Sequence, residues 1–377
     1  MSEFSRLGES AQPSQLALFL RRLHIDVTLL TGLLLLCGIS FVVLWSAGGE
    51  SVSLLFKQAV RFGIAFGVLL AIAQVPPHYL RLWTPWVYAG GLLLLVLVLV
   101  TGDIGKGAQR WLDLGFIRFQ PSEMMKLAVP MMVAWYLHDR ALPPRLLDLI
   151  VAGAIILLPA ALIIEQPDLG TALLVGSAGA FGIFLSGLRW RMIIALFTLL
   201  AIAMPLAWNF MLHGYQKQRV LTFLNPESDP LNTGYHIIQS KIAIGSGGLF
   251  GKGWLNGTQS QLDFLPERHT DFIFAVIGEE FGLLGALVVL VAFTFVIGRG
   301  LFMALQADKT YERLIAGSLI LTFFVYVFVN VGMVIGLLPV VGVPLPLISY
   351  GGTSMVTLMA GFGILMSVYS HRRFVSR

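Results

Sequence analysis

The sequence predicts an all-α integral membrane protein with about ten transmembrane helices. Hydrophobic residues make up 57% of its 377 residues and charged residues only 12%, whereas soluble domains carry about 25% charged residues. The mean hydropathy is +0.83, and apolar residues gather in runs of about 20, the length that crosses the hydrocarbon core of a bilayer. These observations favour one polytopic membrane domain over residues 1–377.

The basic residues give the predicted helices an orientation. Ten helices put both chain ends on one side, and the short connections near 165–168 and 338–348, on the other side, contain no Lys or Arg. The positive-inside rule therefore assigns both termini, including a tail over 1–25, to the cytoplasm. The predicted spans are 26–47, 56–75, 81–101, 121–138, 146–164, 169–187, 191–213, 271–298, 312–337 and 349–370.

Two outer segments, 102–126 and 214–270, carry basic residues, Lys241 among them, against this rule. The second segment connects the seventh and eighth helices, and its apolar, glycine-rich composition predicts a large, partly re-entrant loop. No strand precedes its glycine-rich run 245–253, so tight backbone turns are favoured there over a phosphate-binding loop. A single cysteine, Cys37, and scattered histidines argue against a disulfide framework or a zinc site.

Asp271 lies where this outer segment enters the eighth predicted helix. A carboxylate at a membrane boundary is a candidate functional group, although a cap at Thr270 and the helix dipole also explain it structurally. Asp263, eight residues earlier, could face the same site. Glu279 and Glu280 lie about 100° apart on the helix, so at least one needs a polar partner inside the bundle. Small residues that permit close packing or the approach of a lipid chain follow on the face of Asp271: Ala275, Gly278, Gly282 and Gly285.

A second polar cluster surrounds the start of the fourth predicted helix. Glu123 and Lys126 are three residues apart, close enough to pair, and Arg110 precedes them. A structural ion pair explains this cluster as well as a site where Arg110 and Lys126 hold an anionic headgroup. Asp168 is predicted to cap the sixth helix, and prolines with paired glycines predict a rigid hairpin within 330–354.

The run Asn330 to Ser354 resembles the signature of the SEDS family (shape, elongation, division and sporulation), membrane glycosyltransferases of the bacterial cell wall. The motifs GAQRW, QPSEMMK, QPDLGTA, QSKIAIGSGG and LPERHTDFIF match that family in order along nearly the whole chain. Within the family, Gly257 to Leu262 and Arg268 resemble the elongation member more than the division member.

This resemblance implies polymerisation of lipid II into β-1,4 glycan strands, with release of undecaprenyl diphosphate. It implies that Asp271 is the essential carboxylate, and we expect it to act as the general base toward the acceptor hydroxyl. Glu123 falls on a family motif, and Asp263 stands where relatives often carry Glu. Positive charge is needed where the diphosphate leaves. The basic residues expected to bind it are Arg110, Lys126 and Lys241. Whether a divalent cation shares that role is left open.

Two other classes of function are compatible with the sequence. A flippase or transporter of lipid-linked precursors would use intramembrane acids, and Glu279 and Glu280 are the residues that favour this class. A scaffold of the elongation machinery would leave Asp271 dispensable. By resemblance, the expected partners are a class B penicillin-binding protein and other membrane proteins of the elongation complex, with no nucleic acid. The expected location is the bacterial cytoplasmic (inner) membrane, with the active site on its outer face.

Overall fold

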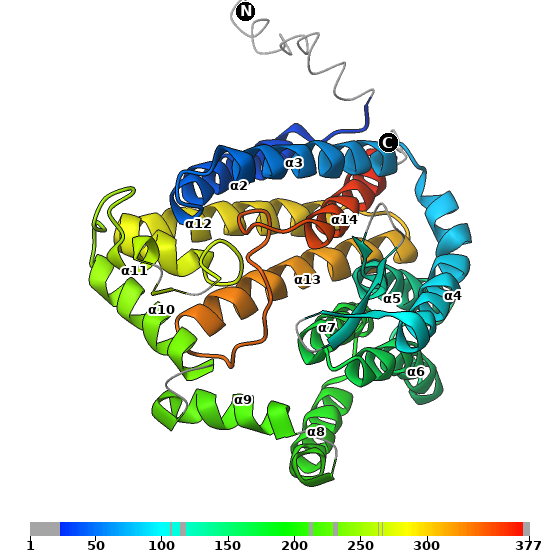
Figure 1. Ribbon diagram of the computed structural model, residues 1–377. Helices are drawn as coiled ribbons and strands as arrows, with labels where there is room; N and C mark the ends of the chain where they lie inside the picture. Colours follow the sequence, from blue (N-terminus) through cyan, green and yellow to red (C-terminus); the bar gives the residue numbers. More distant parts are fainter. Residues whose placement is uncertain are drawn as a thin grey trace, which may run out of the picture.

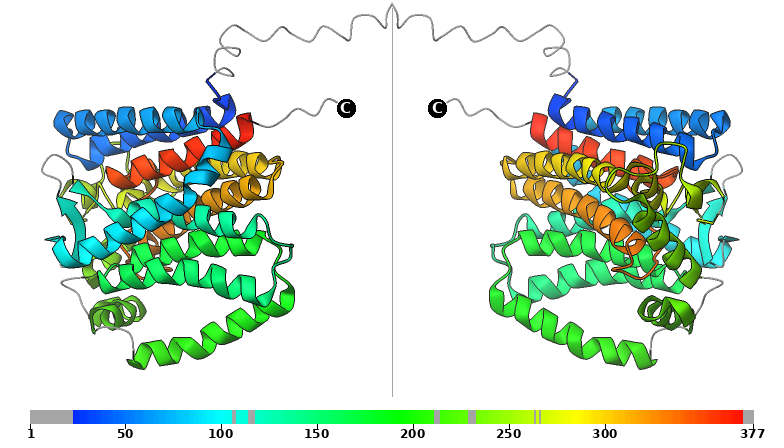
Figure 2. Two further views of the ribbon diagram at one scale, coloured as in Figure 1. Left: turned by 90° about the vertical axis from the view of Figure 1, so that its right-hand side faces the viewer. Right: turned by 90° about the vertical axis from the view of Figure 1, so that its left-hand side faces the viewer.

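The computed structural model describes residues 23–105, 108–113, 118–210, 214–228, 233–262, 264–265 and 267–371. Within these ranges the chain is mainly helical (Figure 1). Figure 2 shows the helices in layers, with α2 (Val27–Ala47) and α3 (Val52–Ala73) at one side of the stack. Residues 1–22 of the predicted cytoplasmic tail lie outside the described residues.

Each of the ten predicted spans coincides with a helix, although several ends differ by some residues. Among the described residues, seven helices are long and apolar enough to cross a membrane, which identifies the chain as a membrane protein. These seven are α2, α3, α4 (Pro77–Thr101), α6 (Leu146–Glu165), α12 (Ile273–Leu305), α13 (Thr310–Val334) and α14 (Thr353–Ser370). The other three are α5 (Pro121–Leu137), α7 (Leu169–Leu185) and α8 (Trp190–Phe210).

Short polar side chains begin several of these helices by binding otherwise unpaired backbone amides. Asp26 Oδ1 accepts a hydrogen bond from the amide of Leu29 at 2.8 Å. Asp168 Oδ1 accepts one from the amide of Thr171 at 3.2 Å, so the predicted cap on α7 is confirmed. Pro121 occupies the first position of α5, where the missing N–H has no intrahelical partner to lose.

A small antiparallel sheet between α4 and α5 was not predicted, so the all-α expectation is wrong in this detail. It contains β1 (Asp103–Gly105), β2 (Ala108–Asp113) and β3 (Arg118–Phe119), in that spatial order. Ile104 pairs with Gln109, and Leu112 pairs with Phe119. Strands this short leave too few alternating positions to give a period-two signal in the sequence.

The outer segment 214–270 contains helices where the sequence predicted a partly re-entrant loop. They are α9 (Gly214–Leu224), a 3-10 turn η1 (Pro226–Ser228), α10 (Thr233–Gly247) and α11 (Thr258–Gln261). α10 packs against α12 (Figure 1). Ala243 and Gly247 are buried in that contact, which accounts for the apolar composition of the segment.

The glycine-rich run forms the tight turn that the sequence favoured. Its amides are occupied by the protein: those of Lys252 and Gly253 donate to the carbonyls of Glu279 and Glu280, each at 3.0 Å. A Cβ added to Gly247 would lie 2.0 Å from the carbonyl oxygen of Gly278. Only glycine permits this approach of two backbones, and the amides of Lys252 and Gly253 are not available to a phosphate.

This contact corrects the expected stripe of small residues below Asp271. α12 begins at Ile273 and is interrupted at Gly282, whose φ is +64°, so one helical wheel does not run from Asp271 to Gly285. Gly278 faces Ile244 of α10, because a Cβ added to it would lie 3.0 Å from that side chain. At Gly278, therefore, the stripe serves backbone packing and offers no surface for a lipid chain.

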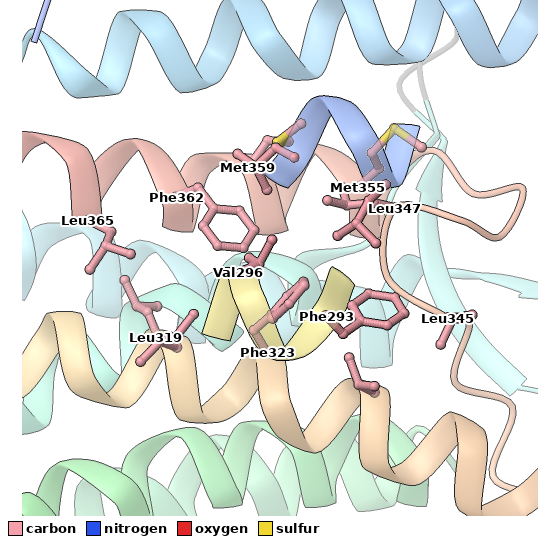
Figure 3. Packing of buried hydrophobic residues seen from close by; sticks show 14 of the residues in the cluster. Phe293, Val296, Leu319, Phe323, Leu345, Leu347, Met355, Met359, Phe362 and Leu365 are labelled. Carbon is pink, nitrogen blue, oxygen red and sulfur yellow. The ribbon is translucent and has the colours of Figure 1, made fainter. Parts of the chain in front are cut away.

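The core lies between α12, α13, α14 and the hairpin that joins the last two helices (Figure 3). The ring of Phe323 lies 5.9 Å from that of Phe293 and 5.0 Å from that of Phe362, measured between centroids. Leu345 and Leu347 bring the hairpin into the same buried cluster. The hairpin is thus anchored by apolar packing and can hold polar groups in place.

Candidate active site on the outer side of the bundle

Asp271 lies in the turn that leads into α12 and is partly exposed. Asn330 of α13 fixes its backbone, because the Asn330 side-chain amide donates to the carbonyl of Asp271 at 2.8 Å and to that of Val343 at 2.7 Å. A Cβ added to Gly342 would lie 3.6 Å from Asp271 Oδ2. The carboxylate therefore lies beside the hairpin at a glycine whose φ is +77°.

The end of the same hairpin holds the two residues before Asp271. Ser349 Oγ donates to the carbonyl of Thr270 at 2.5 Å, and the amide of Tyr350 donates to the carbonyl of His269 at 2.8 Å. Thr270 Oγ1 also donates to Glu267 Oε2 at 2.8 Å. The Asp271 turn is therefore held by hydrogen bonds from α13 and from the hairpin, which places the carboxylate on a rigid support.

Helix α10 borders this turn on another side. The ring of His236 stacks on that of Phe272, with centroids 5.6 Å apart. Burial lowers the pKa of His236, and the negative charge of Glu267 offsets part of this lowering. Lys241 is exposed and lies beside Gly336, where an added Cβ would be 2.7 Å from its Nζ. Lys241 therefore brings a positive charge to the hairpin that contacts Asp271.

Glu123 and Lys126 form a buried ion pair, with Glu123 Oε1 and Lys126 Nζ 2.6 Å apart. Lys126 Nζ also lies 5.1 Å from the ring centroid of Tyr326. Glu123 Oε2 is buried and has no hydrogen-bond partner in the described part of the chain. Tyr326 and Asn330 are four residues apart on α13, about 6 Å along its axis. The ion pair beside Tyr326 therefore lies roughly one helical turn from Asn330, the residue that holds the Asp271 turn.

Arg110 of β2 pairs with the acid that caps α7: its Nη1 lies 3.2 Å from Asp168 Oδ2. The hairpin approaches the same helix end, because a Cβ added to Gly170 would lie 2.9 Å from the carbonyl oxygen of Val341. Val341 precedes Gly342, the neighbour of the Asp271 carboxylate. The hairpin thus contacts the end of α7, where Arg110 pairs with Asp168, and also contacts the Asp271 turn.

Glu279 and Glu280 both find polar partners inside the protein, as expected for at least one of them. Glu279 Oε1 accepts from Lys252 Nζ and from the amide of Gln259, each at 2.8 Å. Ser46 Oγ of α2 donates to Glu280 Oε1. These carboxylates join the glycine-rich segment and α2 to α12, and both are buried.

Asp263, the remaining predicted site residue, lies outside the described residues. In the described ranges, no group of three or more His, Cys, Asp or Glu side chains is placed to hold a metal ion. Two further residues near the site were not predicted from the sequence: Asn330, whose side chain binds the Asp271 turn, and Arg61. Arg61 carries a signal that could have been used, since it is a charge inside an apolar helix.

The fold and site define a polytopic membrane protein whose polar groups converge on a carboxylate beside a rigid hairpin. The sequence model of the FtsW/RodA/SpoVE cell cycle proteins matches residues 20–374. The chain belongs to this family.

Curated relatives and solved structures match nearly the whole chain. It is 53% identical to the peptidoglycan glycosyltransferase MrdB of Escherichia coli K12 over 359 residues, covering 95% of this chain and 97% of the relative. It is 33% identical to the peptidoglycan glycosyltransferase RodA of Treponema pallidum, covering 91% and 97%.

Two solved structures share its fold. A chain from a peptidoglycan synthase complex that coordinates polymerization and crosslinking gives a TM-score of 0.80 at 34% identity, covering 91% of this chain and 97% of that one. The rod shape determining protein RodA of Thermus thermophilus gives a TM-score of 0.69 at 29% identity, covering 91% and 96%.

Proposed function

We propose that this chain is a peptidoglycan glycosyltransferase that polymerises lipid II during cell elongation, with Asp271 as its general base. Supporting the activity, a relative named for it is 53% identical over 95% of the chain. One observation carries the role of Asp271: Asn330, Ser349 and the amide of Tyr350 hold the turn around this carboxylate. A base needs such fixed geometry to take a proton from an acceptor hydroxyl.

In the proposed reaction, Asp271 accepts the proton of the GlcNAc 4-hydroxyl while that oxygen attacks the anomeric carbon of the donor. The bond to the diphosphate breaks, and undecaprenyl diphosphate leaves with the electron pair. Attack from the opposite face inverts the α-linked donor to a β-1,4 product. Positive charge stabilises the leaving group, and the residues we assign to substrate binding are Arg110, Glu123, Lys126, Lys241 and Asp263.

The ion pairs at the site specify how this binding would operate. Lys126 and Arg110 each contact a carboxylate already, so a diphosphate would share these cations with Glu123 and Asp168. Lys241 forms no ion pair with a described carboxylate and would meet the diphosphate directly. Assays with and without EDTA measure whether a divalent cation contributes.

We further propose ten membrane spans in a bacterial inner membrane, with both termini cytoplasmic and the site on the outer face. In support, His24 before α2 and His371 after α14 stack with their centroids 4.2 Å apart. An even number of spans requires the two ends to lie on one side. For crosslinking, we propose a class B penicillin-binding protein as partner, alongside other membrane proteins of the elongation complex.

Transport is the second candidate function, and the acids that would favour it are Glu279 and Glu280. Glu279 is bound by Lys252 and by backbone amides, and Glu280 is bound by Ser46. Acids fixed in this way join segments of the protein together, which weighs against a role in carrying a substrate.

The test is polymerisation of purified lipid II by the chain together with its penicillin-binding partner. Wild type is expected to produce glycan polymer, and Asp271→Asn, which keeps the size of the side chain, is expected to produce none while folding normally. Equal polymerisation by the variant would remove Asp271 from catalysis. No polymer from either protein would favour transport or a scaffold, and a fluorescent lipid-flipping assay would separate those two.

A further inference from the structure

Arg61 is a charged residue within α3, a helix long and apolar enough to cross a membrane. The helix begins at Val52, so nine residues place Arg61 about 14 Å along its axis. A charged side chain within a membrane span is costly and marks a functional site unless other groups compensate it. The groups around Arg61 therefore decide whether it has a function.

Among the residues that the structure describes, Arg61 has an aromatic neighbour and no carboxylate partner. Its guanidinium carbon lies 4.0 Å from the ring centroid of Tyr350, and its Nε would be 3.6 Å from a Cβ added to Gly352. Its Nη1 is buried and has no hydrogen-bond partner among the described residues. Within those residues it forms no ion pair either, so an aromatic face is its main compensation.

This uncompensated charge distinguishes Arg61 from two of the cations assigned to the site. Lys126 is neutralised by Glu123 at 2.6 Å, and Arg110 by Asp168 at 3.2 Å. Arg61 therefore adds net positive charge in a half-buried place, where a charge attracts an anion more strongly than it would in water.

Arg61 lies next to the elements that hold Asp271. Tyr350, on which it stacks, donates its amide to the carbonyl of His269 at 2.8 Å. Gln58, one turn earlier on α3, donates to the carbonyl of Ser349 at 3.4 Å, and its Oε1 is also buried without a partner. One face of α3 therefore presents two unsatisfied polar groups to the end of the hairpin.

Two small pockets near the end of the hairpin share Leu358 as a lining residue. Gly351, beside the Gly352 that Arg61 contacts, lines the first pocket together with Ser354 and Leu358. Leu358 also lines the second, largely apolar pocket, whose wall includes Lys126. The two small pockets therefore lie on either side of Leu358, one at the end of the hairpin and one beside Lys126.

We propose that Arg61 binds a phosphate group of a polyprenyl diphosphate, through hydrogen bonds from its guanidinium fork. The identity of that ligand rests on the proposed function, whereas the phosphate chemistry rests on Arg61 itself. Arg suits this role because its planar fork matches phosphate oxygens in two-point contacts.

The test measures binding of undecaprenyl diphosphate and, separately, phosphatidylglycerol by native mass spectrometry of detergent-purified protein. The background is Asp271→Asn, so that turnover cannot confound binding. Arg61→Gln is expected to weaken diphosphate binding roughly tenfold to hundredfold, the range of a lost hydrogen bond to a charged group. The matched control is Lys57→Gln, an exposed cation one turn earlier on α3, which is expected to change nothing.

Several results would overturn the proposal. Unchanged diphosphate affinity in folded Arg61→Gln, with kcat alone reduced in the active background, would mean that Arg61 only braces Tyr350. Weaker binding of phosphatidylglycerol alone would assign the site to bulk lipid. If Arg61→Gln does not fold, Arg61→Lys replaces it: a severalfold loss supports the fork, and wild-type affinity refutes it. Failure of wild type to polymerise lipid II would refute the proposed function, whereas the measured effect of Arg61→Gln on diphosphate binding would still hold.

Discussion

Asn330 offers the most direct test of how the Asp271 turn is held. Its side-chain amide donates to the carbonyls of Asp271 and Val343 at 2.8 and 2.7 Å, and the residue is fully buried. Asn330→Ala removes both hydrogen bonds and leaves both carbonyls without this donor. The carboxylate of Asp271 is untouched, so the substitution perturbs its position and not its chemistry.

The expected effect follows from two hydrogen bonds of about 1 kcal/mol each, or about 2 kcal/mol together. If this energy holds the carboxylate in its reactive position, its loss lowers kcat/KM for lipid II about 30-fold, since about 1.4 kcal/mol corresponds to a factor of ten. The reduction should fall mainly on kcat, because Asn330 makes its two bonds within the protein. A displaced reacting group can by itself cost about a hundredfold.

The assay is polymerisation of lipid II over a range of concentrations, with thermal unfolding measured in the same preparation. The control is Ser318→Ala on the same helix, since the hydroxyl of Ser318 is buried and donates within α13, to the carbonyl of Leu314 at 2.6 Å. Ser318→Ala should keep near-normal kcat. An Asn330→Ala variant that unfolds at a lower temperature yet keeps wild-type kcat would refute the reasoning that this clamp positions Asp271.

Three further predictions concern stability. Glu279→Leu should lower the unfolding free energy by about 3–5 kcal/mol, seen as a lower Tm, because the Lys252 ammonium loses its buried partner. Gly251→Ala should lower Tm, because its φ is +80° and the new Cβ would lie 2.1 Å from a carbonyl oxygen of α12. The control is Gly245→Ala, whose new Cβ meets open space inside α10. It should raise Tm slightly, because alanine favours a helix more than glycine does. Burial, and then the histidine stacked on it, lower the pKa of His24. The folded state therefore binds fewer protons, stability falls as the pH drops below about 6.5, and His24→Phe should flatten Tm between pH 8 and pH 5.

The sequence predicted the helices well because the apolar residues that make a helix stable in a bilayer are neighbours in the sequence. A run of about 20 apolar residues has few alternatives to a helix in hydrocarbon, since each backbone group must find a partner within the segment. Asp168 shows the same for a helix start, where the cap and the amide it binds are three residues apart. Features determined within one or two turns could therefore be predicted before the structure was seen.

The contacts that build the site could not be predicted in this way. Arg110 meets Asp168 across 58 residues of chain, and Asn330 meets Asp271 across 59. Neither partner has a local sequence pattern that selects the other. The glycine-rich run illustrates the limit: its composition indicated a tight turn, but nothing in it identified α12 as the surface that the turn would cover.

The interruption at Gly282 has a consequence for how the bilayer acts on this protein. Membrane thickness and helix tilt vary, and a spanning helix responds by leaning as a rod. In α12 the residues on both sides of Gly282 are tied by backbone hydrogen bonds to the glycine-rich segment, through the carbonyls of Glu279 and Glu280 and the amides of Leu283 and Leu284. A tilt of α12 would therefore be passed on to the glycine-rich segment and to α10, which packs against the same helix.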